Sequence, residues 1–313
     1  MGSVRPIDAP RVIRPDELAA YLEATEPQQK VLPAGAFKEE LRRSRQPGYA
    51  VDLGFLPWTK ASANFAFRPG EVTLWAGENG SGKSMMLSQV QLSLIAQGFR
   101  CCSASFEMKP FRQLKRMTRQ ASMGMAPSDE FEDELVDYLN ANRLWFYDQQ
   151  GTVRPKQVFA VCRYVADKLG MHHVFIDSLM KCVRGEEDWD AQKDFIDEIT
   201  AIARDSNMHI HIVHHLRKRD DERAVPTKGS VRGHGSIVDQ VDNLMLVWRN
   251  KGKEVDAAKG KDVDETIPDQ MILVEKQRNG EWEGRISLWF HKGAMQYTPD
   301  PSCRPLELYS TGW

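Results

Sequence analysis

The sequence predicts an α/β fold in which a mostly parallel sheet is flanked by helices. From Val72 onward, short apolar runs of strand character alternate with helical segments, the pattern typical of parallel sheets. A glycine-rich segment, residues 77–84, joins the first of these strands to the first of these helices. Two strand-like runs near the C-terminus lie close together around Asn279-Gly280, which is a strong hairpin signal.

The expected elements follow one another along the chain. We expect strands at 72–76, 100–106, 144–148, 174–177, 209–216, 244–248, 270–276 and 286–290. We expect helices at 85–97, around 112–119, at 155–169 and at 191–206. Pro155 in the first turn and Gly170 after the last turn fit the helix between them. Asp190 is expected to cap the helix that follows it.

Residues 1–50 differ from the rest and are expected to form an N-terminal arm. Short helices are predicted at 15–22 and 34–43, but the segment has too little apolar surface for a core of its own. It is therefore either a frayed tail or an arm that docks on something else, such as a neighbouring subunit. Residues 51–313 are expected to form the main domain.

Composition places the chain in a reducing cytoplasm. Among its 313 residues 41% are hydrophobic and 27% charged, which is ordinary for a globular protein. No apolar run approaches the ~20 residues of a membrane span, and the N-terminus lacks the apolar core of a signal peptide. The five cysteines include no C-x-x-C pair. A net charge of −2 does not indicate a protein that coats nucleic acid, although a few focused cations could still grip it.

The segment GENGSGKS, residues 77–84, fits the phosphate-loop pattern G-x-x-x-x-G-K-[ST]. Its glycines let backbone N–H groups turn inward around phosphate oxygens at a helix N-terminus, which already favours anions. Lys83 would reach the β- and γ-phosphates, and the Ser84 hydroxyl would hold Mg²⁺. The candidate nucleotide-binding residues here are Gly77, Asn79, Gly80, Ser81, Gly82, Lys83, Ser84 and Met85.

Two acids follow predicted strands, and ligands bind beyond the carboxyl ends of parallel strands. Asp177 ends the strand 174–176 and suits an acid that holds Mg²⁺, directly or through water. Glu107 follows the strand that ends at 106. If that strand neighbours the phosphate-loop strand, the Glu107 carboxylate could polarise the attacking water; otherwise it is a surface glutamate.

Histidines and cations also occupy strand ends. One of His214 and His215 is a candidate γ-phosphate sensor, because both end a strand. The polar stretch 217–235 is either a solvated loop or a DNA-contacting loop, in which Lys and Arg neutralise phosphates. In isolation Lys276 and Arg278 are ordinary surface charges. Because they stand two apart on a strand and point the same way, both could instead reach one anionic group, including a nucleotide in an adjacent subunit.

Taken together, these motifs resemble the RecA-type core of the ring-forming replicative DNA helicases: the bacterial DnaB type, mitochondrial Twinkle and the bacteriophage primase-helicases. The resemblance runs from about Leu56 to Tyr297. Its motifs occur in the family's order: GENGSGKS at 77–84, SFEM at 105–108, FID at 175–177, HHLRK at 214–218, GS at 235–236 with Gln240 and Asp242, Arg249, and KQRNG at 276–280.

By matched position, the resemblance implies a hydrolytic site with ATP, or another NTP or dNTP, and Mg²⁺. Lys83 and Ser84 match the residues that bind phosphate and Mg²⁺. Glu107 matches the catalytic glutamate and Asp177 the second magnesium acid. His215 matches the γ-phosphate sensor of the phage-type members.

The resemblance also implies contacts between subunits. Arg278 looks like an arginine finger that enters the next subunit's site, with Lys276 beside it. Arg249 and Phe290 would sandwich the nucleotide base. Two departures stand out: no primase domain precedes the core, and the glutamine expected after the Gly-Ser motif is shifted by one position, to Gln240.

The function that this resemblance implies is an NTP-driven, hexameric DNA helicase that moves 5′ to 3′ on single-stranded DNA in a bacterial or phage-infected cell. Its expected partners are copies of itself and a separate primase, loader or polymerase. Two alternatives remain open. One is a RecA-like recombinase that forms filaments, and the other is a nucleotide-dependent loader or regulatory DNA-binding module.

Overall fold

A computed structural model describes residues 19, 34–43, 53–58, 61, 63–124, 126–141, 143–183, 188–217, 224–232 and 235–309. Of the predicted N-terminal arm, the helix at 34–43 is found, as a 3-10 turn η1 (Ala34–Phe37) followed by α2 (Lys38–Arg43). The helix expected at 15–22 lies almost wholly outside the described residues, as does part of the polar stretch 217–235.

A central sheet organises the described part of the chain, in the order β11-β10-β9-β8-β3-β7-β6-β4-β5. The six strands from β8 to β5 run parallel, whereas β9, β10 and β11 form antiparallel pairs at one edge. The bounds are β3 (Val72–Gly77), β4 (Cys101–Ser105), β5 (Leu144–Phe146), β6 (His173–Asp177), β7 (His209–His215), β8 (Asn243–Arg249), β9 (Gln270–Gln277), β10 (Gly284–His291) and β11 (Gln296–Thr298). A short separate sheet pairs β1 (Gly54–Phe55) with β2 (Ala66–Phe67). The predicted mostly parallel sheet with a C-terminal hairpin is thus confirmed.

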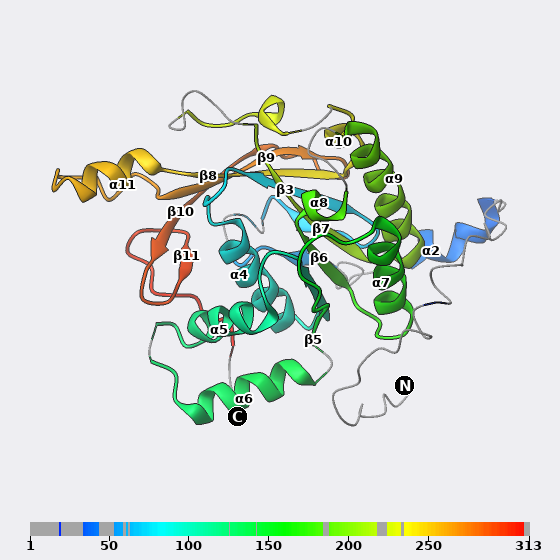
Figure 1. Cartoon of the computed structure of the whole chain (residues 1–313), viewed down its shortest axis with the longest axis horizontal. Coiled ribbons are helices and arrows are strands. Elements are labelled where there is room, and N and C mark those ends of the chain that lie inside the picture. Colours follow the sequence, from blue (N-terminus) through cyan, green and yellow to red (C-terminus); the bar gives the residue numbers. More distant parts are fainter. Residues whose placement is uncertain are drawn as a thin grey trace.

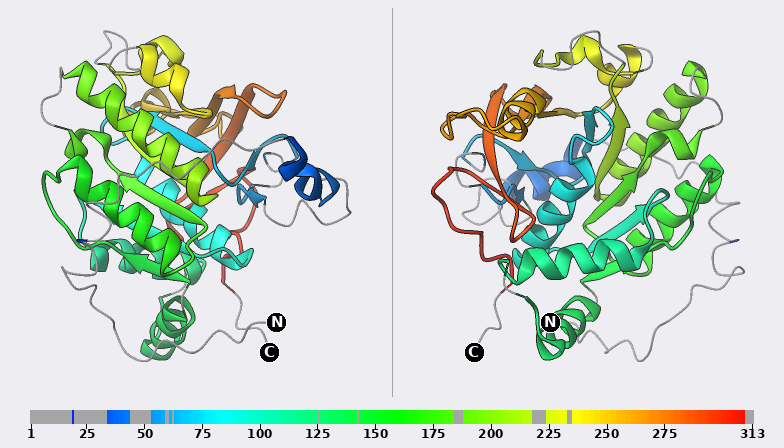
Figure 2. Two further views of the ribbon diagram at one scale, coloured as in Figure 1. Left: turned by 90° about the vertical axis from the view of Figure 1, so that its right-hand side faces the viewer. Right: turned by 60° about the vertical axis from the view of Figure 1, so that its left-hand side comes forward.

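Helices cover both faces of this sheet (Figure 1; Figure 2). Alternate residues of β3 explain why, because Leu74 packs in one buried apolar cluster and Trp75 in the other. On the Leu74 side lie α7 (Pro155–Asp167), α8 (Leu179–Cys182), α9 (Trp189–Ser206) and α10 (Gly235–Gln240). On the Trp75 side lie α4 (Lys83–Ala96), α5 (Pro110–Ala121) and α6 (Asp129–Asn140). None of the helices in the described residues is both long and apolar enough to span a bilayer.

Strand register brings the carboxyl ends of the parallel strands to one edge. Gly77 at the end of β3 lies opposite His215 on β7 and Val247 on β8. Ser105 on β4 lies opposite Asp177 on β6. The Glu107 strand does not neighbour the phosphate-loop strand, because β7 and β6 separate β4 from β3.

One cap and several helices differ from expectation, and the short helices α8 and α10 were not predicted. The helix α9 is capped by Asp188, whose carboxylate accepts from the Ala191 N–H at 3.0 Å, not by Asp190. The helix α6 was not predicted, although Phe131, Leu135, Tyr138 and Leu139 recur along it at helical spacing and face the core. The helix α11 (Lys251–Ala258) buries no residue at all, so it has no apolar period to recognise.

Three histidines are buried in the core on the Trp75 side of the sheet. His173 and His211 approach ring to ring, with Nδ1 and Nε2 3.2 Å apart. His209 bonds the Thr73 hydroxyl at 2.8 Å and the Arg68 carbonyl at 2.7 Å. Burial lowers the pKa of His209 to about 4 and holds the pKa values of His173 and His211 well below the usual range. These imidazoles are therefore neutral, hydrogen-bonded core residues.

Candidate functional site

The phosphate loop turns between the end of β3 and the start of α4. Gly80 and Gly82 have positive φ, 73° and 84°, which L side chains rarely adopt. A side chain at Gly77 would meet the Ser81 Oγ at 2.6 Å and the Val247 carbonyl oxygen at 2.8 Å. The loop therefore needs glycine for its turns and for its close approach to the neighbouring strand.

Lys83 is the first residue of α4, and its side chain folds back over the loop. Its Nζ donates to the Gly77 and Glu78 carbonyl oxygens, each at 2.8 Å. Burial lowers the pKa of Lys83 to about 8, against the opposing pull of Asp177, Glu107 and Glu78. A phosphate group at this position would supply the ammonium with the counter-charge that two carbonyls do not.

Oxygen ligands for a divalent cation lie next to this lysine. The Ser84 hydroxyl donates to Asp177 Oδ2 at 2.9 Å, although β6 and α4 are far apart in sequence. Burial raises the pKa of Asp177, and a bound cation would favour its ionised form. A hydroxyl beside a carboxylate is the kind of oxygen donor set that Mg²⁺ takes, so the residues fit that ion.

Glu107 joins this group from the far side of β6. The Ser178 hydroxyl donates to Glu107 Oε1 at 3.1 Å, which links the end of β4 to the residue after β6. The Glu107 side chain thus reaches the cavity although its strand, β4, is not adjacent to β3.

These side chains line one cavity of about 600 Å³, a size typical of small-molecule sites. Most predicted site residues line it: Asn79, Gly80, Ser81, Gly82, Lys83, Ser84, Met85, Glu107, Asp177, His215, Arg249 and Phe290. His214, the other candidate sensor, is buried beneath it and bonds the Arg232 carbonyl oxygen at 2.7 Å, and burial lowers its pKa to about 4. Its place is structural.

Lys276 and Arg278 do not line the cavity of their own chain. Because β9 runs antiparallel to β8, its C-terminal end lies at the opposite edge of the sheet from the phosphate loop. There Lys276 Nζ donates to the Val238 and Asp239 carbonyls at 2.8 Å, and Arg278 pairs with Asp242 at 3.1 Å.

Further cavity-lining residues had no predicted role: Arg116, Glu254, Asp269, Gln270 and Tyr297. Arg116 Nη1 is buried without a hydrogen-bond partner, and burial lowers its pKa while Asp177 opposes that shift. Gln270 donates to the Ser81 carbonyl oxygen at 2.8 Å and so braces the phosphate loop from β9. Arg116 carried a sequence signal in the basic run of its helix, whereas Tyr297 lies on β11, a strand too short to recognise.

The sheet order, the glycine-rich loop after β3 and the acids at the strand ends define a RecA-like P-loop NTPase core. Comparisons with known proteins agree with this fold. Residues 66–221 match a family model described as an AAA domain. The structure is similar to a solved structure described as an ATPase domain, with a TM-score of 0.67 and 16% identity over 85% of this chain and 99% of that one.

A second similar structure is a DnaB-like replicative helicase that was described together with its interactions with primase. It has a TM-score of 0.67 and 15% identity, over 86% of this chain and 68% of that one. The expected fold, the RecA-type core found in DnaB-like helicases, is therefore confirmed.

Proposed function

We propose that this chain is the subunit of an NTP-driven, ring-forming DNA helicase that moves 5′ to 3′ on single-stranded DNA. One observation carries the proposal: the cavity unites Lys83, Ser84, Asp177 and Glu107, while the cation predicted to complete the site, Arg278, lies at the opposite edge of the sheet. In this arrangement residues 51–313 form the motor domain, and residues 1–50 form an arm that docks on a neighbouring subunit.

In the proposed hydrolysis, different residues of the chain bind the phosphates, hold the metal ion and accept the proton. The loop amides and Lys83 hold the phosphates of ATP or another NTP. Ser84 and Asp177 would hold Mg²⁺, which supplies charge neutralisation on the phosphate oxygens. Glu107 takes the proton of the attacking water, and Ser178 orients its carboxylate; general-base action of this kind is worth ~10²–10⁴-fold.

Two further residues face the same chemistry. His215, at the end of β7, lines the cavity close to the loop and is proposed to sense the γ-phosphate. Arg116, whose buried Nη1 has no hydrogen-bond partner, is proposed to donate to the terminal phosphate from α5. A charge-assisted bond of this type is worth ~1.5–3 kcal/mol.

Arg278 is proposed to act on the nucleotide of the next subunit, with Lys276 beside it. Its side chain is 39% exposed, so it can reach a partner. Its Nη2 donates to the Asp239 and Gln240 carbonyls at the end of α10, at 3.0 and 3.2 Å. Because α10 begins where the polar segment 217–235 ends, this contact offers a physical path from a neighbour's nucleotide to a loop proposed to contact DNA.

Strand separation on a forked DNA duplex tests the proposal directly. The wild-type protein with Mg²⁺ and ATP should separate the strands, and Lys83→Ala should not. If wild type hydrolyses ATP but separates no duplex, the chain is a loader or regulatory module instead. If Lys83→Ala unwinds at the wild-type rate, the motor proposal fails. Particle images with nucleotide distinguish closed rings from the filaments of a recombinase.

A further inference from the structure

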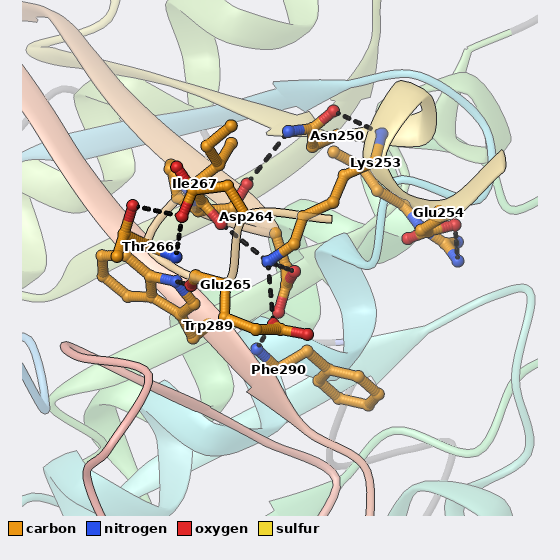
Figure 3. A network of polar contacts seen from close by, with 12 residues as sticks. Asn250, Lys253, Glu254, Asp264, Glu265, Thr266, Ile267, Trp289 and Phe290 are labelled. Carbon is orange, nitrogen blue, oxygen red and sulfur yellow. Dashed lines mark hydrogen bonds and ion pairs between the residues drawn. The ribbon is translucent and has the colours of Figure 1, made fainter. Parts of the chain in front are cut away.

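A polar network ties the helix α11 to the strands beside the cavity (Figure 3). Its centre is Lys253, whose side chain is only 8% exposed. The Lys253 Nζ lies 2.9 Å from Asp269 Oδ1 and 3.3 Å from Glu265 Oε2, and it donates to the Ile267 carbonyl oxygen at 2.7 Å. The contacts of this one lysine side chain thus fix α11 to the segment that leads into β9.

Asp269 carries this attachment on to β10. Its second oxygen, Oδ2, accepts from the Phe290 N–H at 2.8 Å. Its main chain accepts from the Asn250 N–H at 2.8 Å and donates to the Leu288 carbonyl oxygen at 3.0 Å. The position of Phe290, which lines the cavity, therefore depends on the same carboxylate that holds Lys253.

The next residue of α11 holds the other cavity wall. Both carboxylate oxygens of Glu254 accept from Arg249, at 2.6 Å from Nε and 2.8 Å from Nη2. The remaining Arg249 nitrogen, Nη1, donates to the Gly80 carbonyl oxygen at 2.8 Å. Both side chains are over two-fifths exposed, so the pair adds little stability, but its two parallel bonds fix the plane of the guanidinium.

We propose that Lys253 is the positioning residue of a base clamp, in which it sets the spacing between the Arg249 guanidinium and the Phe290 ring. The proposal rests on the proposed function, since it places the base of the nucleotide between these two groups. A planar cation and an aromatic ring both stack on heteroaromatic bases. Lys253 acts through its neighbours and need not touch the nucleotide.

The network also indicates which bases the clamp accepts. The carboxylates of Glu254 and Asp269 and the guanidinium of Arg249 are already engaged in hydrogen bonds within the chain. The clamp therefore holds the faces of the base, which purines and pyrimidines share, rather than its edge. The substrate class that follows is nucleoside triphosphates of either type.

Competition binding with three ligands tests the clamp. Mg²⁺ complexes of ATP, CTP and inorganic tripolyphosphate are each used to displace a fluorescent nucleotide. We expect Lys253→Met to weaken ATP and CTP by about tenfold, the order of a partly lost stacking contact, and to leave tripolyphosphate unchanged. Lys261→Met is the matched control, because Lys261 pairs with Asp256 of α11, the helix that also holds Lys253, and its side chain is 61% exposed. It should bind all three ligands like wild type.

A second variant covers the case in which Lys253→Met does not fold. Asp269→Asn keeps an acceptor for the Phe290 N–H but removes the charge opposite Lys253, so it should show the same base-dependent loss. Wild-type affinity for ATP in both variants overturns the clamp, as does an equal loss for tripolyphosphate. If wild type binds none of the three ligands, the proposed function fails together with the clamp.

Discussion

The carboxylate of Glu107 accepts a hydrogen bond that orients it. Its strand is not adjacent to the phosphate loop, and the Ser178 hydroxyl holds its Oε1 at 3.1 Å. Glu107 lines the same cavity as Asp177, whose carboxylate accepts a hydrogen bond from the Ser84 hydroxyl. In the proposed site these two carboxylates would have different roles: Asp177 would hold the metal ion and Glu107 would accept the proton of the water.

Glu107→Gln should lower ATP turnover by ~10²–10⁴-fold, because the amide cannot accept the proton of the attacking water. Phosphate release at saturating ATP measures this loss. Binding of Mg²⁺–ATP should stay near the wild-type value, because Lys83, Ser84 and Asp177 are unchanged. A variant that hydrolyses ATP at the wild-type rate would remove Glu107 from the chemistry.

Arg116→Met should act in opposite directions on stability and on binding. Without nucleotide, loss of a buried donor that lacks a partner should raise the free energy of unfolding by about 1 kcal/mol. Affinity for ATP should fall more than affinity for ADP, because the proposed contact is to the terminal phosphate. Thermal melts and titrations with both nucleotides check the two effects, and equal losses for ATP and ADP would place Arg116 elsewhere.

Among the secondary-structure elements, those that bury a periodic set of apolar residues could be predicted from the sequence. The parallel strands and α4, α7 and α9 were recognisable because each buries an apolar run or stripe. Strand order was not, because β4 and β3 show the same pattern whether or not β6 and β7 lie between them. The helix α11 was not predicted because it packs no apolar stripe on the core. The polar contacts of Lys253 attach it to the fold instead.

The buried histidines of β6 and β7 predict how stability depends on pH. The folded state keeps His209 neutral to a pKa of about 4, whereas the unfolded chain takes up that proton near its ordinary ~6.5. The contribution of His209 to the free energy of unfolding should therefore be fully present above pH 6.5. It should be lost as the pH drops towards 4, which lowers the free energy of unfolding by about 3 kcal/mol.

Urea denaturation across this pH range measures the effect. His209→Gln should be less stable at pH 7, because it loses bonds to Thr73 and Arg68, but its stability should depend less on pH. His291→Gln, at an exposed position on β10, is the matched control and should keep the wild-type slope. An unchanged slope in His209→Gln would show that this imidazole does not resist protonation.

In the whole molecule, the proposed function uses groups at both ends of the parallel strands. The phosphate loop and its acids lie at the carboxyl edge of the parallel strands, and Arg278 lies at the other edge because β9 is antiparallel. One chain therefore presents a nearly complete site on one side and a half-exposed cation on the other. We propose that copies arranged head to tail complete each other's sites.

A mixing experiment with two inactive variants tests this claim most directly. Lys83→Ala lacks a working nucleotide site but keeps Arg278, whereas Arg278→Ala keeps the site and lacks the finger. An arginine finger is worth ~10³–10⁵ in rate, so each variant alone should be almost inactive in ATP turnover while Arg278→Ala still binds nucleotide. A mixture of the two variants should recover turnover well above the sum of their separate rates. A mixture that shows only that sum, or full turnover by Arg278→Ala alone, would contradict the claim.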